Sequence, residues 1–163
     1  MDSSTSFSGA QMLNQYSSSW KMLRTAIRNS DESVWSYSRK KWFFALTLYH
    51  IIETMDFYSR STPNSMEWGK RAGYNWDDVK DPSTDILPLL SPQLLSNYLM
   101  DMIDRITSIL ISMNDESFYS KDGFHWFDSV FHKYLYLLRH NQHHLGEIAF
   151  VLRATSNVVM KWT

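Results

Sequence analysis

The chain has 163 residues, a formal net charge of −1 and no cysteine. This length predicts a single domain over residues 1–163. Its longest basic run is Arg39-Lys40-Lys41, which argues against a nucleic-acid partner, because phosphate binding needs an excess of basic side chains. The absence of cysteine excludes disulfides, a thiolate nucleophile and cysteine-based metal sites. Any transition metal must therefore be held by histidine and carboxylate side chains.

Hydrophobic residues make up 44% of the chain, which excludes global disorder, and the 5 glycines and 4 prolines favour long helices over a turn-rich β fold. Residues 1–5 lack the basic and apolar segments of a signal peptide. The most apolar stretch, residues 42–52, is too short to span a bilayer. We therefore expect a cytoplasmic protein without a membrane partner.

Two helices are predicted in the first third of the chain. Over residues 11–28, large apolar side chains recur every three or four positions, the spacing of one helix face: Leu13, Tyr16, Trp20, Leu23 and Ile27. A second helix is predicted over residues 37–58, with His50 on its inward stripe. Since this helix is apolar on nearly all faces, we expect it to be buried on several sides, either within the fold or in a homodimer interface.

Two further helices are predicted in the second half. Ser91 is a good N-cap and Pro92 suits the first helical position, which predicts a helix over residues 91–113. The last helix is predicted over residues 127–153, after a turn at residues 121–123. The four helices predict an all-α fold.

The connections between these helices differ in length. The first is short, so the first two helices should be antiparallel. The second, residues 59–90, could reach roughly 100 Å when extended, so it can run the length of the molecule and let the third helix lie parallel to the second. Its aromatic residues Trp68, Tyr74 and Trp76 indicate a packed flap.

Three of the six histidines fall on inward positions. At about 100° per residue, His144 lies about 60° and His140 about 100° from the apolar centre of the last helix, on the same side. His143 falls on the solvent side of this helix, about 160° from the apolar centre. His132 also falls on the solvent side. His140 and His144 are spaced i and i+4, so they occupy adjacent turns of one helix face.

Together with the inward His50, this pair resembles the open three-histidine arrangement of catalytic zinc, which leaves a fourth position for water or substrate. The alternative is a set of ordinary core histidines bonded to their neighbours. The pair is not the metalloprotease H-E-x-x-H motif, because position 141 is asparagine. Glu53 and Glu147 could orient the histidines, but we interpret both, and Asp56, as solvated surface residues.

These residues resemble the DinB-like superfamily, which includes YfiT-type metal-dependent hydrolases and thiol S-transferases. The resemblance rests on residues 48–53 around His50 and on residues 140–148, where the family pattern is H-x-x-H-H-R-G-Q followed by an apolar residue. Here Leu145 replaces the arginine and Glu147 replaces the glutamine.

The resemblance implies a four-helix bundle with an up-down-down-up course. It also implies a divalent metal, often zinc or nickel, held by His50, His140 and His144. Members are often dimers. Characterised relatives use bacillithiol or similar thiols, and this chain, having no cysteine, would need an external low-molecular-weight thiol.

Three functional hypotheses remain open. In the first, a zinc, nickel, iron or manganese ion lowers the pKa of a bound thiol or water, which then attacks an unknown small-molecule substrate. In the second, a non-catalytic stress or scaffold protein is stabilised by the same metal. In the third, the protein is a helical interaction module with ordinary core histidines. The departures at Leu145 and Glu147 are compatible with a loss of activity.

Overall fold

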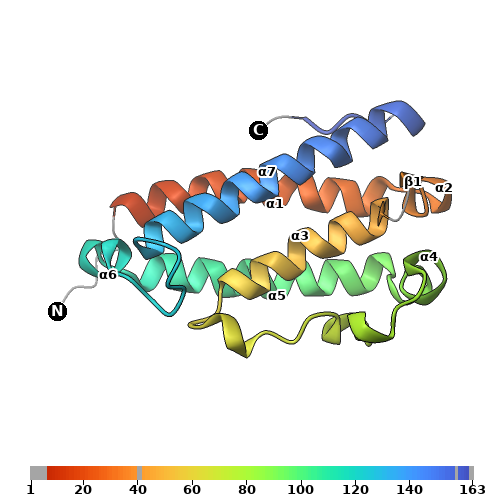
Figure 1. Ribbon diagram of the computed structural model, residues 1–163. Helices are drawn as coiled ribbons and strands as arrows, with labels where there is room; N and C mark the ends of the chain where they lie inside the picture. Colours follow the sequence, from red (N-terminus) through yellow and green to blue (C-terminus); the bar gives the residue numbers. More distant parts are fainter. Residues whose placement is uncertain (1–6, 40–41, 157, 162–163) are drawn as a thin grey trace.

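Four long helices make up most of the computed structural model, which describes residues 7–39, 42–156 and 158–161 (Figure 1). They are α1 (Phe7–Asn29), α3 (Phe44–Tyr58), α5 (Pro92–Ser112) and α7 (Val130–Thr155). Figure 1 shows α3 and α5 running in the opposite direction to α1 and α7. Both α1 and α3 pack against α5 and α7, so the apolar core lies among the four helices. The predicted all-α class is confirmed.

Helix α1 uses the predicted apolar stripe. Tyr16, Trp20, Leu23 and Ile27 are buried, and the Tyr16 hydroxyl donates to the carbonyl of Tyr134 in α7 at 2.7 Å. The helix begins at Phe7, four positions before the predicted start. Ser8 Oγ lies 2.8 Å from the Tyr119 hydroxyl of α6 (Asp115–Tyr119), and this contact holds the first turn. The serine-rich stretch of residues 3–8 predicts a frayed terminus, which is wrong for Phe7 and Ser8, because both lie in α1. Residues 1–6 lie outside the described part.

The second predicted helix begins later than expected. The described residues of this range before Phe44, which are 37–39, 42 and 43, are not helical, and α3 starts at Phe44. A short helix, α2 (Glu32–Trp35), leads into an antiparallel ribbon of β1 (Ser38–Arg39) and β2 (Trp42–Phe43). The backbone of Phe43 is extended, and the Phe44 amide donates to the Tyr37 carbonyl at 2.9 Å. The ribbon thus uses aromatic residues that the periodicity assigned to a helix, because aromatic side chains also suit strands.

The connection between α3 and α5 is an ordered flap. Its helical turns are η1 (Pro63–Ser65), η2 (Lys70–Ala72), η3 (Trp76–Asp78), α4 (Pro82–Asp85) and η4 (Leu87–Leu89). Trp68 packs on Phe57 with ring centroids 5.1 Å apart, and Ile86 is fully buried. Figure 1 shows this segment returning alongside α5 to the end of the molecule at which α3 begins. The predicted packed flap is confirmed, and it lets α5 run parallel to α3.

The last two long helices begin at serine caps. The Ser91 side chain accepts a hydrogen bond from the Leu94 amide at 3.1 Å, as predicted. Ser129 accepts from the His132 amide at 3.1 Å, so α7 begins three positions after the predicted start. Within the described residues, no helix is long and apolar enough to cross a membrane.

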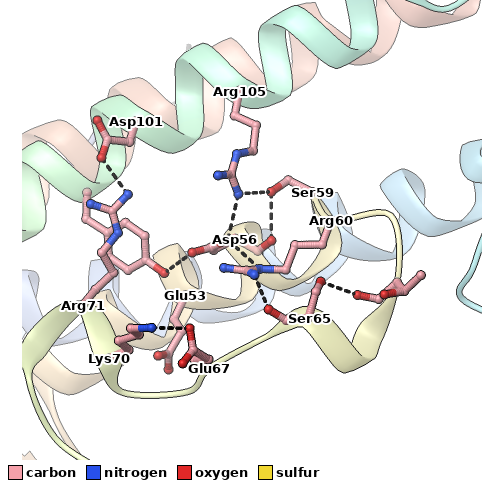
Figure 2. Close-up of polar contacts among 12 residues, drawn as sticks. Glu53, Asp56, Ser59, Arg60, Ser65, Glu67, Lys70, Arg71, Asp101 and Arg105 are labelled. Atoms are coloured by element: carbon pink, nitrogen blue, oxygen red, sulfur yellow. Dashed lines mark hydrogen bonds and ion pairs between the residues drawn. The ribbon is translucent and has the colours of Figure 1, made fainter.

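Two acidic residues of α3 are buried, which corrects their interpretation as surface residues. Glu53 is 3% and Asp56 4% exposed. Figure 2 shows that Asp56 lies between α5 and the flap. Its Oδ1 accepts from Arg60 Nε and Arg105 Nη1, both at 2.9 Å, and its Oδ2 accepts from the Tyr98 hydroxyl at 2.8 Å. The flap and α5 cover this face of α3, and the sequence periodicity of α3 alone does not reveal that cover.

Glu53 ties the flap to α3. Its Oε1 accepts from the Gly69 amide at 2.5 Å and from the Tyr49 hydroxyl at 3.1 Å. Gly69 has a φ of +79°, and a Cβ at this position would lie 2.4 Å from the Tyr74 carbonyl oxygen. A glycine is therefore required where the flap meets the carboxylate.

The burial of Glu53 predicts a pH-dependent stability. Burial raises the pKa of Glu53 from 4.5 to about 7, although the two hydrogen bonds act against this shift. The folded state therefore holds a proton that the unfolded state releases, so this residue's contribution to the free energy of unfolding falls as the pH rises from about 4.5 to about 7. Between pH 5 and 7.5 we expect a loss of about 2 kcal/mol that is absent in Glu53→Gln.

The measurement is urea unfolding of wild type and Glu53→Gln at pH 5 and pH 7.5. His50 and His140 contribute a pH dependence of the opposite sign, because their pKa values are lowered. This contribution cancels in the difference between the two proteins. A difference that does not change with pH would mean that Glu53 is ionised throughout.

Candidate metal centre

Three imidazoles from two helices meet at one point of the fold. His50 lies in the middle of α3, and His140 and His144 lie one turn apart on α7. One ring nitrogen of each histidine lies within 4.8 Å of a ring nitrogen of the other two. The Nε2 atoms of His50 and His140 are 3.1 Å apart. The structure therefore brings together all three histidines that the sequence singled out.

His143, which precedes His144 on α7, points outward. The side chain of His143 is 71% exposed, as the helical wheel predicts, and that of His132 is 48% exposed. His143 does form a second, outer group with His144 and Glu147, whose candidate ligand atoms also lie within 4.8 Å of one another. Two overlapping groups thus share His144, and the one containing His50 is the more buried.

Glu147 holds the ring of His144. Its Oε2 lies 2.6 Å from His144 Nδ1, and its side chain is 55% exposed. Because a carboxylate can only accept, we assign the proton of the imidazole to Nδ1, which leaves the lone pair on Nε2. The prediction of a surface position for Glu147 is confirmed, but the side chain is not merely solvated. The i, i+3 spacing of the two residues on a helix is the signal that points to this contact.

The other two histidines are electrically neutral at physiological pH. Burial, followed by the proximity of His140 and His144, lowers the pKa of His50 to about 4. Burial, followed by the proximity of His144, lowers the pKa of His140 to about 4. Neutral imidazoles have a free lone pair for a cation, and three of them crowded together are less favourable when protonated.

This donor set fits a divalent transition metal. Imidazole nitrogens suit zinc, nickel, iron and copper. In a tetrahedral zinc site with Zn–N bonds near 2.0–2.1 Å, two ligand nitrogens lie about 3.3 Å apart, close to the 3.1 Å between His50 Nε2 and His140 Nε2. Within the described residues, the group that contains His50 includes no carboxylate. The donor set is therefore three imidazole nitrogens.

A cleft of about 720 Å³ opens beside the histidines. The residue before the ribbon, the strand β2 and the helix α3 line one side of it: Tyr37, Trp42, Phe43, Phe44, Thr47 and His50. The helix α7 lines the other side: His143, His144, Gly146, Glu147, Ile148, Phe150 and Val151. The ring of Trp42 meets that of His50 edge to face, with centroids 5.5 Å apart. The sequence does not point to Trp42 at this site, because the residue falls within the predicted helix over residues 37–58.

Leu145 has a structural role. It is fully buried in the core, on the face of α7 opposite to the exposed Gly146 and Glu147. An apolar side chain therefore occupies the position at which the resembled pattern has arginine.

The contact between Glu147 and His144 gives a prediction. In Glu147→Gln the amide oxygen can still accept from Nδ1, so we expect metal affinity to fall less than about threefold, whereas Glu147→Leu removes the acceptor and should lower it about 10–100-fold. The measurement is competition with a chromophoric chelator. Equal affinities for the two variants would mean that this hydrogen bond does not orient the ring.

Comparison of the chain with family models, with curated proteins and with solved structures gave no match.

Proposed function

We propose that His50, His140 and His144 bind a divalent metal and that the protein is a metal-dependent enzyme acting on a small molecule. The observation that carries this proposal is the meeting of three half-buried imidazoles beside a cleft of about 720 Å³. Sites with three protein ligands and an open position are typical of catalytic metals, whereas structural sites have four protein ligands.

Each part of the site has a distinct task. His50, His140 and His144 hold the ion, and Glu147 keeps His144 in the tautomer that presents Nε2. A bound zinc or nickel ion, or iron or manganese, would act as a Lewis acid and lower the pKa of a thiol or water. Since the chain has no cysteine, a thiol would have to come from an external low-molecular-weight compound.

The resemblance to the DinB-like superfamily supports the transferase or hydrolase form of this proposal. The helix directions in Figure 1 are compatible with the up-down-down-up bundle of that family. We also propose a cytoplasmic protein without nucleic-acid or membrane partners, and a homodimer. The apolar faces of α3 are buried within the chain, so a dimer would have to use another surface.

A non-catalytic, metal-stabilised stress or scaffold protein is the second candidate. The observation that favours it is the burial of Leu145, because no charged side chain from this position enters the cleft. The two candidates differ in whether an external ligand can reach the ion. In a scaffold protein, the ion would raise stability without exchanging ligands with solutes.

The test is metal titration of protein stripped with a chelator. We expect one zinc or nickel ion per chain by isothermal titration calorimetry. The cobalt-loaded protein should change its visible spectrum when azide or a small thiol is added, since an open position exchanges ligands. Failure to bind zinc, nickel or cobalt would refute the proposal. Stoichiometric metal with a spectrum that solutes leave unchanged would favour the scaffold protein.

A further inference from the structure

Gly146 is an unusual residue for its position. It lies within α7, a helix of 26 residues, and glycine in a helix interior lowers stability relative to alanine. The glycines with positive φ are Gly69 and Gly73, so the backbone of Gly146 does not need glycine. A Cβ built on Gly146 would meet no atom within 4 Å, so close packing does not need it either. Neither common reason for a helical glycine applies.

Gly146 lines the cleft beside the histidines, one turn before Phe150. The missing side chain therefore leaves this wall of the cleft open. The wall across from α7 includes the rings of Tyr37, Trp42 and Phe43. The cleft volume of about 720 Å³ lies within the range of small-molecule sites, roughly 300–1,000 Å³.

Two large aromatic side chains of the cleft are held in contact with water. Trp42 is 47% and Phe150 52% exposed, one on each wall. Covering such rings with an apolar group is favourable, because it removes apolar area from water. The rings also offer faces and edges on which another aromatic group can stack.

The polar groups of the cleft are few. Among the described residues that line it, those that can carry charge are His50, His143, His144 and Glu147. Glu147 already accepts from His144. No lysine or arginine is among these described lining residues.

We propose that the cleft binds a small molecule through an aromatic group, which packs between Trp42 and the Gly146–Phe150 wall, with the polar atom of the ligand facing the three histidines. The inference deepens the proposed function, on which it rests for the role of the polar atom. It assigns aromatic compounds as the substrate class and makes Gly146 the residue that leaves room for the ring.

The test compares imidazole with 4-phenylimidazole, which adds only a phenyl ring. Binding to cobalt-loaded protein is followed in the visible spectrum, and binding to metal-free protein is followed by amide shifts in NMR spectra. We expect 4-phenylimidazole to bind at least about tenfold more tightly, and we expect shifts at Gly146, Ile148 and Val151 with or without metal.

Two variants of α7 complete the design. Gly146→Leu should abolish the tenfold preference while raising Tm by a few degrees, since it removes a helical glycine, so the loss cannot come from unfolding. The matched control, Ala154→Leu, adds bulk at an exposed position of the same helix that does not line the cleft, and should keep the preference.

The outcomes separate this inference from the proposed function. Equal affinities for the two probes, with one metal ion per chain, would overturn the aromatic cleft and leave the metal site standing. A protein that binds no metal but shows cleft shifts with 4-phenylimidazole would support the cleft and refute the metal enzyme. A preference that survives in Gly146→Leu would overturn the role of Gly146.

Discussion

His50→Ala is expected to lower the affinity for zinc or nickel about a thousandfold, because the site loses one of three nitrogen ligands and the only one supplied by α3. His144→Ala should have a similar effect. Competition with a chromophoric chelator measures both. The loss should be greater than for any change at Glu147, which acts only through the His144 ring.

The control for these variants is His143→Ala. His143 is a histidine of the same helix next to His144, but its side chain is 71% exposed and it is not part of the group that contains His50. We expect its removal to change metal affinity less than threefold. If His143→Ala has the larger effect, the ion binds to the outer group of His143, His144 and Glu147 instead.

The same variants should change the thermal response to metal. A ligand that binds only the folded state stabilises it by about 2.7 kcal/mol when present at 100 times its Kd. Wild type and His143→Ala should therefore show a rise in Tm on metal addition, and His50→Ala should show none. A metal-dependent rise in Tm that persists in His50→Ala would place the stabilising ion elsewhere.

Asp56→Ala is expected to lower the free energy of unfolding by about 3 kcal/mol. Removal of this buried carboxylate leaves the Tyr98 hydroxyl without its acceptor and separates Arg105 from its partner across the α3–α5 contact (Figure 2). Breaking a buried, hydrogen-bonded charge pair typically costs 3–5 kcal/mol, although the side chain of Arg105 is 43% exposed, which reduces the effect. Urea unfolding measures it.

Asp101→Ala is the matched control. Asp101 pairs with Arg71 at 2.8 Å, but both side chains are about half exposed, so the loss should stay below about 1 kcal/mol. Tyr98→Phe should lose about 1–2 kcal/mol, since it leaves one carboxylate oxygen with one donor fewer. Equal effects of Asp56→Ala and Asp101→Ala would mean that the Asp56 network adds no more stability than a surface ion pair.

Features that depend on local geometry could be predicted from the sequence. The apolar spacing from Tyr16 to Ile27 marks a helix face, because residues three and four apart lie on one side of any α-helix. Ser91 caps α5 through a hydrogen bond to an amide three residues away. His140 and His144 share a face of α7 for the same local reason. Their inward direction, and that of His50, could therefore be read from sequence spacing alone.

Features that depend on contacts between distant segments were decided by the tertiary structure. Asp56 and Glu53 are polar residues on a helix, and they are buried only because α5 and the flap cover them. Trp42 lies in a ribbon because its extended backbone pairs with β1, although its spacing also fits a helix.

The cleft also depends on contacts between distant segments and could not be predicted from the sequence. It is formed by the ribbon and α7, which are about 100 residues apart in the chain. The sequence by itself determined which histidines face inward. Only the packing of α3 against α7 decided that they meet, and that an aromatic cleft opens beside them.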